Sequence, residues 1–501
     1  MSQRPIRFVH RGQVVQVDGL VPTTSVLSWL REHARCSGTK EGCNEGDCGA
    51  CTVLVGQLEA TPTGPRIAYQ PLNSCIQFLP TLDGKILRTV EDLGGTHPAQ
   101  QALVECHGSQ CGFCTPGFVM SLVACHDQHR AAGTRPSRQA LADVLSGNLC
   151  RCTGYRPILD AGQRMFDLPA SPPDDAAALT ALQWLAADLP LHCGAGGGHA
   201  FHAPRSLDAL AELRAQRPQA SLLAGGTDVA LWVNKQLRDL GELIYLGEVA
   251  ELKAITVADG VLTMGAGASL AAAWGALAQH WPDTLAMGLR FASPPIRNAG
   301  TLGGNIANGS PIGDAAPVLM ALGAQIVLRH GDTQRSLALP DFYVGYMQSQ
   351  LRAGEFVEAL VLPMPVPMPM PGAKQHLRAY KLSKRFDSDI SGLACGLWLQ
   401  MDGDRVADCR FAFGGLAATV KRATHAEAQV RGQPWTEATL SAAMAALGQD
   451  FSPLSDLRAS AAYRHKAAAN LLRRFWLETR PADPLPRSAT QVWPERLSSN
   501  V

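Results

Sequence analysis

Three cysteines lie within nine positions near the start of the chain, in the stretch EGCNEGDCGACTV at residues 41–53. Cys43, Cys48 and Cys51 are separated by four residues and then by two. Buried structural cysteines scatter along a core, and disulfides need partners that face each other across the fold. Neither role explains three thiols on one glycine-rich loop. The spacing therefore indicates that all three thiols bind a single object.

The spacing of four and then two residues is typical of plant-type [2Fe–2S] sites, whose two irons need four thiolates. Cys75 can supply the fourth thiolate. The loop glycines keep bulk away and free backbone N–H groups to hydrogen-bond the sulfurs. The alternatives are a four-cysteine zinc site or inert core thiols, but zinc knuckles favour two CxxC-like pairs. We therefore predict a [2Fe–2S] cluster at Cys43, Cys48, Cys51 and Cys75.

A second set of cysteines consists of two close pairs, Cys111 with Cys114 in QCGFCTPG and Cys150 with Cys152 in LCRCTGYRP. Cysteines two apart point to different sides of a helix, so the C-x-C pair can ligate a metal only in a loop or at a helix end. Both pairs precede predicted helices, where unpaired N–H groups and the helix dipole favour anionic sulfur. Zinc is the competing metal here, because two pairs of cysteines are its usual ligand pattern. The neighbouring predicted cluster favours a second [2Fe–2S], and two clusters in succession form a path for single electrons.

The totals place limits on fold, partners and compartment. A chain of 501 residues is too long for one core and predicts three or four domains. The 44 basic and 43 acidic residues nearly cancel, so nucleic acid and anionic membranes are not expected partners. No apolar run approaches the ~20 residues of a membrane span, and the polar N-terminal stretch is unlike a signal peptide. We expect a cytoplasmic protein, where thiols stay reduced, so 14 cysteines favour metal or redox chemistry.

Strand and helix signals divide the chain into a cysteine-rich first third and a cysteine-poor remainder. Strand patterns at residues 6–10 (IRFVH) and 13–19 (QVVQVDG) precede a helix signal, TTSVLSWLREHA, which indicates an α+β sheet domain. The next segment is predicted to be helical, with Pro116 in a first turn and Ser137 as a cap. Short strands then alternate with Ala/Leu-rich helices, and a proline–methionine run, LPMPVPMPMPG, precedes a last domain of strands and helices. The predicted units are residues 1–90, 91–168, a linker at 169–198 with one short helix, 199–370, 371–485 and a tail at 486–501.

Two later stretches are rich in glycine. In LLAGGTDVALWVN, Gly225, Gly226 and Thr227 stand at the end of a predicted strand, where bare backbone amides could cradle a pyrophosphate. This signal is weak alone, because it is not G-x-G-x-x-G and glycine-rich turns are common. The second stretch, TLGGNIANGSPIGD, ends at Asp314 and is predicted to form a polar loop too elaborate for a simple turn.

Together, the motifs EGCNEGDCGACTV, QCGFCTPG, NLCRCTGYRPI and TLGGNIANGSPIGD resemble the xanthine dehydrogenase branch of the molybdenum hydroxylases, over almost the whole chain. The resemblance implies a multidomain α+β fold. Its parts are a β-grasp ferredoxin-like domain, a helical [2Fe–2S] domain, an α+β FAD-binding domain of the vanillyl-alcohol-oxidase (PCMH) type and a small α+β C-terminal domain like that of the carbon monoxide dehydrogenase flavoprotein. Both iron–sulfur domains and the flavin domain on one chain are similar to the small subunit of bacterial two-subunit members of this family.

Position by position, the resemblance implies an FAD site. It places residues 222–229 around the diphosphate, Phe291 beside the flavin ring and Lys381 near the cofactor. Phe291 as a core residue and Lys381 as a surface charge are the alternatives. The segment KLSKRFDSDIS matches a family loop that influences nicotinamide access, and Phe386 and Ser388 stand where relatives often carry charge. The implied FAD residues are Leu222, Leu223, Ala224, Gly225, Gly226, Thr227, Asp228, Val229, Phe291, Thr301, Leu302, Gly303, Gly304, Asn305, Asp314 and Lys381.

The resemblance also implies a function. A partner chain with the molybdenum cofactor oxidises hypoxanthine to xanthine and xanthine to urate, and electrons pass through the helical-domain cluster, the ferredoxin-like cluster and FAD to NAD+. No residue of this chain is expected to catalyse purine hydroxylation, because the family's molybdenum domains need several hundred more residues. Two such chains would assemble with two molybdenum chains. The alternatives are the same role in an oxidation of aldehydes or N-heteroaromatic acids, and a zinc-stabilised binding scaffold with no redox role.

Overall fold

The structure is a computed structural model that describes residues 3–170, 175–365 and 374–490. The chain forms two compact units and crosses between them several times before residue 301. Among the described helices, none combines the length and the apolar character that crossing a membrane requires. The first unit consists of Met1–Leu213, Gln219–Ala250 and Ala292–Gly300, and the second of Arg214–Pro218, Glu251–Phe291 and Thr301–Val501.

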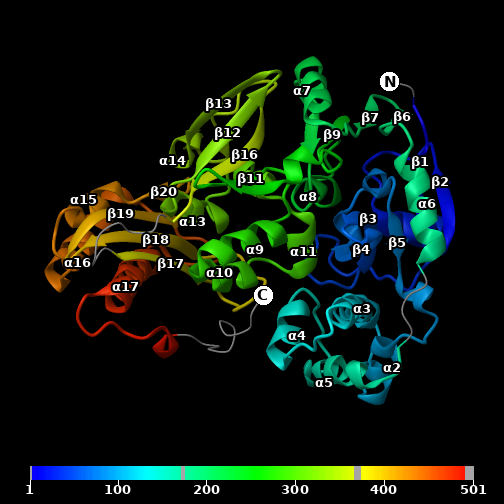
Figure 1. The fold of residues 1–501 in the computed structure, drawn as a ribbon, viewed down its shortest axis with the longest axis horizontal. Helices are drawn as coiled ribbons and strands as arrows, with labels where there is room; N and C mark the ends of the chain where they lie inside the picture. The colour runs from blue at the N-terminus through cyan, green and yellow to red at the C-terminus, as the bar shows by residue number, and fades with distance from the viewer. Residues whose placement is uncertain (1–2, 171–174, 366–373, 491–501) are drawn as a thin grey trace. The chain divides into compact units, whose positions relative to one another are not determined.

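The first unit begins with a mixed five-stranded sheet (Figure 1). Its strands, in spatial order, are β2 (Gln13–Val17), β1 (Ile6–His10), β5 (Ile86–Arg88), β3 (Thr52–Thr61) and β4 (Gly64–Asn73). The two strands predicted from the sequence form the antiparallel pair β1–β2, and β1 pairs in parallel with β5. The predicted helix is short: α1 (Val26–Ser28) is capped by Ser25 and continues as a π-helical turn over Trp29–His33. Phe8, Leu30 and Phe78 fill the core below it.

Helices follow the sheet, as the sequence predicts. Pro116 lies in the first turn of α3, and the Ser137 side chain accepts the N–H of Ala140 at the start of α4. Phe118, Leu122 and Ile158 bury their apolar faces in one shared core. The helices are α2 (Pro98–Glu105), α3 (Thr115–Ala131), α4 (Arg138–Val144), α5 (Arg156–Arg164) and α6 (Ala176–Ala186), the last being the short helix of the predicted linker.

The first unit is completed by a four-stranded sheet of later residues. In spatial order its strands are β6 (His192–Gly196), β7 (His199–His202), β9 (Glu242–Tyr245) and β8 (Ser221–Leu223). Helices α8 (Val229–Asn234) and α11 (Pro294–Ala299) belong to the same unit, while α7 (Leu207–Gln216) ends in the second. Phe201, Leu223 and Leu243 share a buried core with Phe8 and Phe78 of the N-terminal sheet. The two sheets are therefore parts of one packed body.

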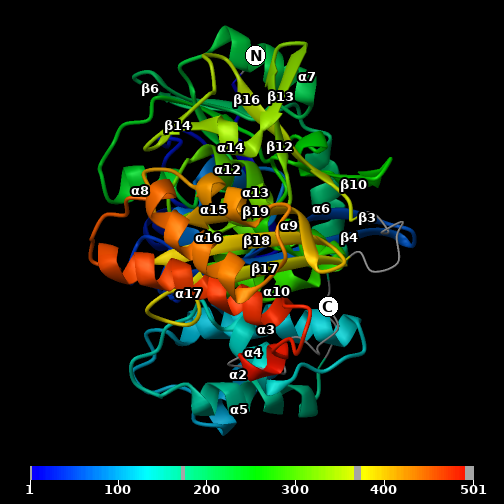
Figure 2. The ribbon, with the colours of Figure 1, turned by 90° about the vertical axis from the view of Figure 1, so that its left-hand side faces the viewer.

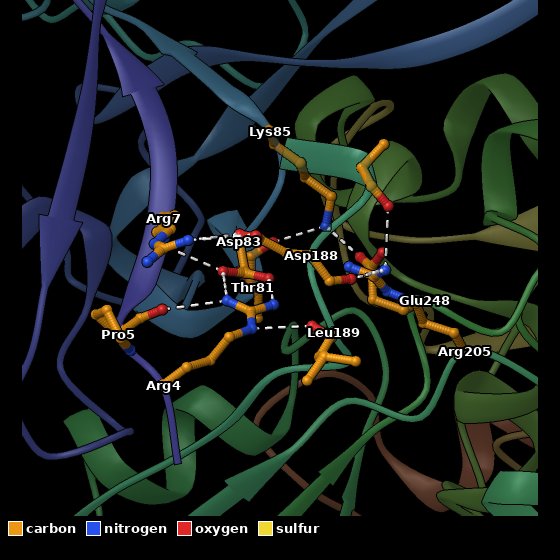
Figure 3. Close-up of polar contacts among 11 residues, drawn as sticks. Arg4, Pro5, Arg7, Thr81, Asp83, Lys85, Asp188, Leu189, Arg205 and Glu248 are labelled. Atoms are coloured by element: carbon orange, nitrogen blue, oxygen red, sulfur yellow. Dashed lines mark hydrogen bonds and ion pairs between the residues drawn. The ribbon is translucent and has the colours of Figure 1, made fainter. Parts of the chain in front are cut away.

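Ion pairs reinforce this body next to the starts of β1 and β5 in the N-terminal sheet (Figure 3). The guanidinium of Arg4 donates to both carboxylate oxygens of Asp83, at 2.8 and 2.6 Å. The ammonium of Lys85, whose side chain is only 12% exposed, pairs with Glu248 at 2.8 Å. Because Glu248 lies beyond β9, this pair ties the N-terminal sheet to the four-stranded sheet.

The second unit contains a five-stranded antiparallel sheet with helices around it. In spatial order the strands are β10 (Ile255–Ala258), β11 (Val261–Gly265), β16 (Phe356–Pro363), β12 (Gln325–His330) and β13 (Thr333–Ala338), with the small pair β14 (Tyr343–Gly345) and β15 (Gln348–Ser349) beside them in sequence. The helices are α9 (Leu270–His280), α10 (Leu285–Arg290), α12 (Leu302–Ala307), α13 (Ala315–Ala321) and α14 (Leu339–Phe342). The predicted polar loop thus contains a helix, α12, which buries Leu302 and Ile306 four residues apart.

The second sheet of this unit contains β17 (Lys374–Leu382), β18 (Leu393–Asp402), β19 (Arg405–Gly414) and β20 (Lys421–Arg422). Figure 2 shows α15 (Thr424–Val430), α16 (Glu437–Asp450) and α17 (Ala461–Thr479) over one face of it. Cys395 and Leu397 pack into the core that these helices share, whereas Trp398 packs into the core that contains α13. The alternation covers both faces of the sheet. Most of the proline–methionine run lies outside the described residues.

Candidate metal and cofactor sites

The structure brings the first predicted cysteine set together. Cys43, Cys48 and Cys51 come from the loop between α1 and β3, and Cys75 comes from a 3-10 turn directly after β4. The Cys43 thiol shares hydrogen bonds with the thiols of Cys48 and Cys75, and Cys51 shares one with Cys75. The four sulfurs therefore face one another across a small space between the loop and the turn.

Backbone N–H groups also point at this space. The N–H groups of Asp47 and Cys48 each donate to the sulfur of Cys43, at 3.3 Å. Gly46 has a φ of +80°, which lets the loop turn back on itself there. Hydrogen bonds from the thiols of Cys48 and Cys75, followed by the backbone N–H, lower the pKa of Cys43. Donors of this kind stabilise anionic sulfur, which is the form that ligates a metal.

The second predicted set also converges. The sulfurs of Cys111 and Cys152 are 3.6 Å apart, and the thiols of Cys114 and Cys150 interact with each other. Cys114 is the residue that caps α3, and the second cysteine pair lies just before α5, as predicted. Burial and the Cys150 thiol raise the pKa of Cys114 to about 12. For Cys150 burial opposes ionisation, but hydrogen bonds from Thr153 outweigh it and lower the pKa.

The thiols of the second set fit metal ions that take two thiolates each. Two sulfurs bound at ~2.3 Å to one tetrahedral ion lie about 3.8 Å apart, close to the separation of Cys111 and Cys152. The second contact, Cys114 with Cys150, forms a second such pair. A [2Fe–2S] cluster needs two pairs, one for each iron. Cys111 and Cys152 are exposed, whereas Cys150 is buried.

The two cysteine sets are joined directly by backbone. The N–H of Leu149 donates to the carbonyl of Cys48 at 3.0 Å, and the buried amide of Asn148 donates to the carbonyl of Gly49 at 3.1 Å. A Cβ atom on Gly117 would collide with the carbonyl of Gly49, so this glycine permits the close approach of α3. Asn148 also accepts the hydroxyl of Ser121 at 2.7 Å. This junction was not predicted from the sequence, although Asn148 stands two residues before a predicted ligand.

The first set is also joined to the glycine-rich stretch at residues 222–229, which forms the connection between β8 and α8. The side-chain amide of Gln77 donates to the carbonyl of Gly225 at 3.1 Å. A Cβ on Gly225 would collide with the carbonyl of Ala299, and one on Gly226 would stand 2.7 Å from the carbonyl of Ile76. Both glycines are thus explained by close packing of backbones. Leu223 is buried, while Asp228 is exposed and precedes α8.

The second unit carries the other predicted flavin residues. Thr301 caps α12 by accepting the N–H of Gly304 at 3.1 Å, and the N–H of Gly303 donates to Ala266 at 2.8 Å. Leu302 is buried beneath them. The buried side-chain oxygen of Asn305 has no hydrogen-bond partner among the described residues. An unpaired buried acceptor fits a site that takes a polar ligand with a donor group.

Asp314 and Lys381 form a buried ion pair in this unit. Their carboxylate and ammonium are 2.5 Å apart, and their side chains are 5% and 2% exposed. Ser391 donates to the other oxygen of Asp314, also at 2.5 Å. Lys381 is therefore not a surface charge, contrary to the alternative considered for it. A buried pair of this kind is costly to desolvate, which favours a role beyond solubility.

Phe291 lies within reach of this pair. The Lys381 ammonium is 6.0 Å from the centre of the Phe291 ring, and the ring is 6.1 Å from that of Trp274. Phe291 is half-buried and packs against the core of the second unit, so it is in part the core residue of the alternative interpretation. Its neighbour Arg290, which the sequence did not single out, donates to the carbonyls of Phe386 and Lys381 at 2.9 and 2.8 Å. Arg290 thus binds the start and the middle of the segment at residues 381–391.

Three family models match the chain. Residues 89–163 match a [2Fe-2S] binding domain, residues 197–365 match the FAD binding domain in molybdopterin dehydrogenase, and residues 378–479 match the CO dehydrogenase flavoprotein C-terminal domain. The match over residues 89–163 contains both pairs of the second cysteine set. The chain is therefore a multidomain α+β protein with a [2Fe–2S]-binding domain and an FAD-binding domain.

Individual known proteins and solved structures are also similar to this chain. A xanthine dehydrogenase of Emericella nidulans is 33% identical over 94% of this chain, and the chain spans 38% of that protein. Aldehyde oxidase 2 of Cavia porcellus is 29% identical over 94% of the chain, which spans 39% of it. Among solved structures, a chain of reconstituted CO dehydrogenase from Oligotropha carboxidovorans matches 55% of this chain and 94% of its own length, with 28% identity and a TM-score of 0.51.

Proposed function

We propose that this chain, a homologue of the xanthine dehydrogenases and CO dehydrogenases of the molybdenum hydroxylase family, is the electron-transfer subunit of a xanthine dehydrogenase. The observation that carries the proposal is the continuous contact between three sites in the first unit. The second cysteine set touches the first through Leu149 and Cys48, and the first touches the loop at residues 222–229 through Gln77. Short separations between neighbouring sites favour stepwise transfer of single electrons.

The residues would hold the following groups. Cys111, Cys114, Cys150 and Cys152 hold one [2Fe–2S] cluster, Cys43, Cys48, Cys51 and Cys75 hold the other, and the predicted flavin residues hold FAD. When bound, the clusters carry single electrons and FAD supplies hydride chemistry toward NAD+. The chain itself positions these groups, and the glycines at the junctions between them keep side chains out of the space where the backbones meet.

The second cysteine set is where electrons would arrive. Cys111 and Cys152 are exposed, and large apolar side chains stand exposed in the same loops: Phe113, Leu149 and Tyr155. Exposed apolar residues around a metal site favour contact with another protein surface. We infer that the partner is a subunit with the molybdenum cofactor, in an assembly of two chains of each kind in the cytoplasm.

At the flavin end, the buried Asp314–Lys381 pair and the half-buried Phe291 ring would orient the cofactor. Arg290 would keep the Phe386 segment in place beside them, where the family places the access route of the nicotinamide. The substrate of the partner would be hypoxanthine or xanthine, as the name of the Emericella relative suggests. The similarity to an aldehyde oxidase supports the second candidate, the same electron path in an enzyme that oxidises aldehydes or N-heteroaromatic compounds.

A metal and flavin assay on the purified chain tests the proposal. Two clusters predict about four irons and four labile sulfides for each chain, together with one FAD and the visible spectrum of iron–sulfur flavoproteins. Zinc in place of iron, or absence of flavin, would contradict it and favour the zinc-stabilised scaffold. Anaerobic bleaching of the flavin by NADH tests the acceptor. Turnover of xanthine against aldehydes by the complex with the co-purifying partner tests the substrate.

A further inference from the structure

Helix α8 ends against the first cysteine set. The side-chain amide of Asn234, the last residue of α8, donates to the carbonyl of Cys75 at 2.9 Å and lies 3.3 Å from the side-chain oxygen of Asn44. The ammonium of Lys235, the next residue, donates to the carbonyl of Cys43 at 2.5 Å. Two adjacent side chains thus bind the peptide groups of two predicted ligands that lie on separate segments of the chain.

The other end of α8 is anchored as well. The N–H of Ala230 donates to the carbonyl of Gly226, so the helix begins directly at the glycine-rich loop. Ala230 is fully buried in the core that also contains Cys51 and Cys75. A helix fixed at both ends and along one side has little freedom to move relative to the cysteines. It therefore sets the geometry between this loop and the first cysteine set.

Charge adds a second effect. A reduced [2Fe–2S] cluster carries one more negative charge than an oxidised one, so a nearby cation favours reduction. The Lys235 ammonium contacts the peptide of a predicted ligand, and its side chain is 41% exposed, which weakens its field by solvent screening. Glu45 lies 3.5 Å from the same ammonium and offsets part of the charge. The ammonium, and not the carboxylate, is the group that binds the Cys43 carbonyl.

We propose that Asn234 and Lys235 are positioning residues for the cluster at Cys43, Cys48, Cys51 and Cys75: they hold its two ligand segments together and raise its reduction potential. The inference rests on the proposed function, because it needs the cluster to be present. Neither residue lies in a cysteine motif. Asn234 is 159 positions from Cys75 in the sequence, and Lys235 is 192 positions from Cys43.

The test is a redox titration of the whole chain with its clusters and FAD, in which the EPR signal of each cluster is followed separately. Lys235→Gln is expected to shift the reduction equilibrium of the first cluster about threefold toward the oxidised form. Lys235→Glu is expected to shift it about tenfold, which is 59 mV for one electron. The signal of the second cluster serves as an internal reference and is expected to stay within error.

Arg66→Glu is the matched control for charge. Arg66 pairs with Glu59 near the tip of the β3–β4 hairpin, on the exposed surface. It lies seven residues along β4 from Asn73, which is about 23 Å at the rise of a strand and beyond the ~10 Å screening length. A shift in Lys235→Glu no larger than that in Arg66→Glu would overturn the tuning role.

Asn234→Ala tests the positioning role. Loss of the hydrogen bond to the Cys75 carbonyl is expected to make release of iron to a chelator several times faster. In Gln236→Ala, a variant of the exposed neighbouring residue, the rate of iron release is expected not to increase. Equal rates in the two variants would overturn that role. If Lys235→Glu loses the first cluster altogether, retention of the cluster and its potential in Lys235→Arg supports the proposal, and loss in both contradicts a specific role of charge. Wild-type chain without two EPR signals would instead refute the proposed function itself.

Discussion

The backbone N–H of Leu149 donates a 3.0 Å hydrogen bond to the carbonyl of Cys48. Cys48 is a predicted ligand of the first cluster, and Leu149 directly precedes Cys150, a predicted ligand of the second. One hydrogen bond therefore separates the main chains of the two cysteine sets. Because Gly49 and Gly117 also meet there without side chains between them, the junction is as short as backbone contact allows.

Cys43→Ser is expected to remove one of the two cluster EPR signals and leave the other. The two thiol sets do not share a cysteine, so the second set keeps all four of its ligands. Cys36→Ser is the control, because Cys36 is buried near His10, at 3.7 Å, and belongs to neither set. Two intact signals in Cys43→Ser would show that the ligands are misassigned.

Gly49→Ala is expected to destabilise the junction more than Gly84→Ala destabilises its own turn. Both glycines have positive φ, +70° and +72°, which costs an L-residue about 1–2 kcal/mol. A Cβ at Gly84 meets nothing within 4 Å, whereas one at Gly49 collides with the carbonyl of Gly147. Thermal unfolding and the spin–spin interaction between the clusters measure the two variants. Equal losses of stability would mean that the close contact at Gly49 is not needed.

Phe291→Ala is expected to weaken or retune the flavin without affecting either cluster. The ring stands 6.0 Å from the Lys381 ammonium in the second unit, while the cysteines lie in the first. Flavin content and flavin potential are the measurements, with both EPR signals as the control. Unchanged flavin properties would return Phe291 to a purely structural role in the core.

Lys85→Met is expected to lower the stability of the first unit by about 2 kcal/mol, below the 3–5 kcal/mol of fully buried pairs because Glu248 is 28% exposed. Burial disfavours the charge on Lys85, but Glu248 and Tyr245 outweigh it and raise its pKa. The variant removes the ion pair that Lys85 makes with the Glu248 carboxylate. The double variant with Glu248→Gln is expected to regain part of the loss. A double variant as unstable as the sum of the two single variants would mean that the pair is not coupled.

His376 is expected to make the second unit less stable as the pH falls below 6.5. Burial, then Arg378 and Lys374, lowers the pKa of His376 from 6.5 to about 4. The unfolded chain therefore takes up the proton first, so the stability is fully present above pH 6.5 and falls toward pH 4. The slope is at most about 1.4 kcal/mol for each pH unit, and roughly half that for a partly exposed ring.

Hydrogen exchange of the β17–β18 amides between pH 7.5 and 5.5, corrected for the intrinsic rate, measures this effect. His376→Gln is expected to flatten the pH dependence, and His330→Gln, at an exposed position in the same unit, is expected to leave it unchanged. An equally steep loss in His376→Gln would assign the dependence to other groups.

Local chemistry in the sequence was enough to predict many of the elements, and it predicts two sets of cysteine ligands. The Ser137 side chain caps a helix by accepting a backbone N–H of its first turn, and Pro116 fits a first turn. The cysteine spacings match the ligand requirement of two irons. These signals act over a few residues and do not depend on the rest of the fold. The helix α12 was missed because its glycines suggest a loop, whereas burial of Leu302 and Ile306 stabilises it.

Contacts between distant residues were decided only by the tertiary structure. Lysine is usually exposed at the surface, yet packing buries Lys381 against Asp314, 67 positions away. Asn234 and Lys235 lie outside both cysteine motifs, and only the shared core of the two sheets of the first unit brings α8 to Cys75 and Cys43. The physical reason is the range of the forces: caps and metal-ligand spacings are set by neighbours along the chain, while burial and ion pairing are set by neighbours in space.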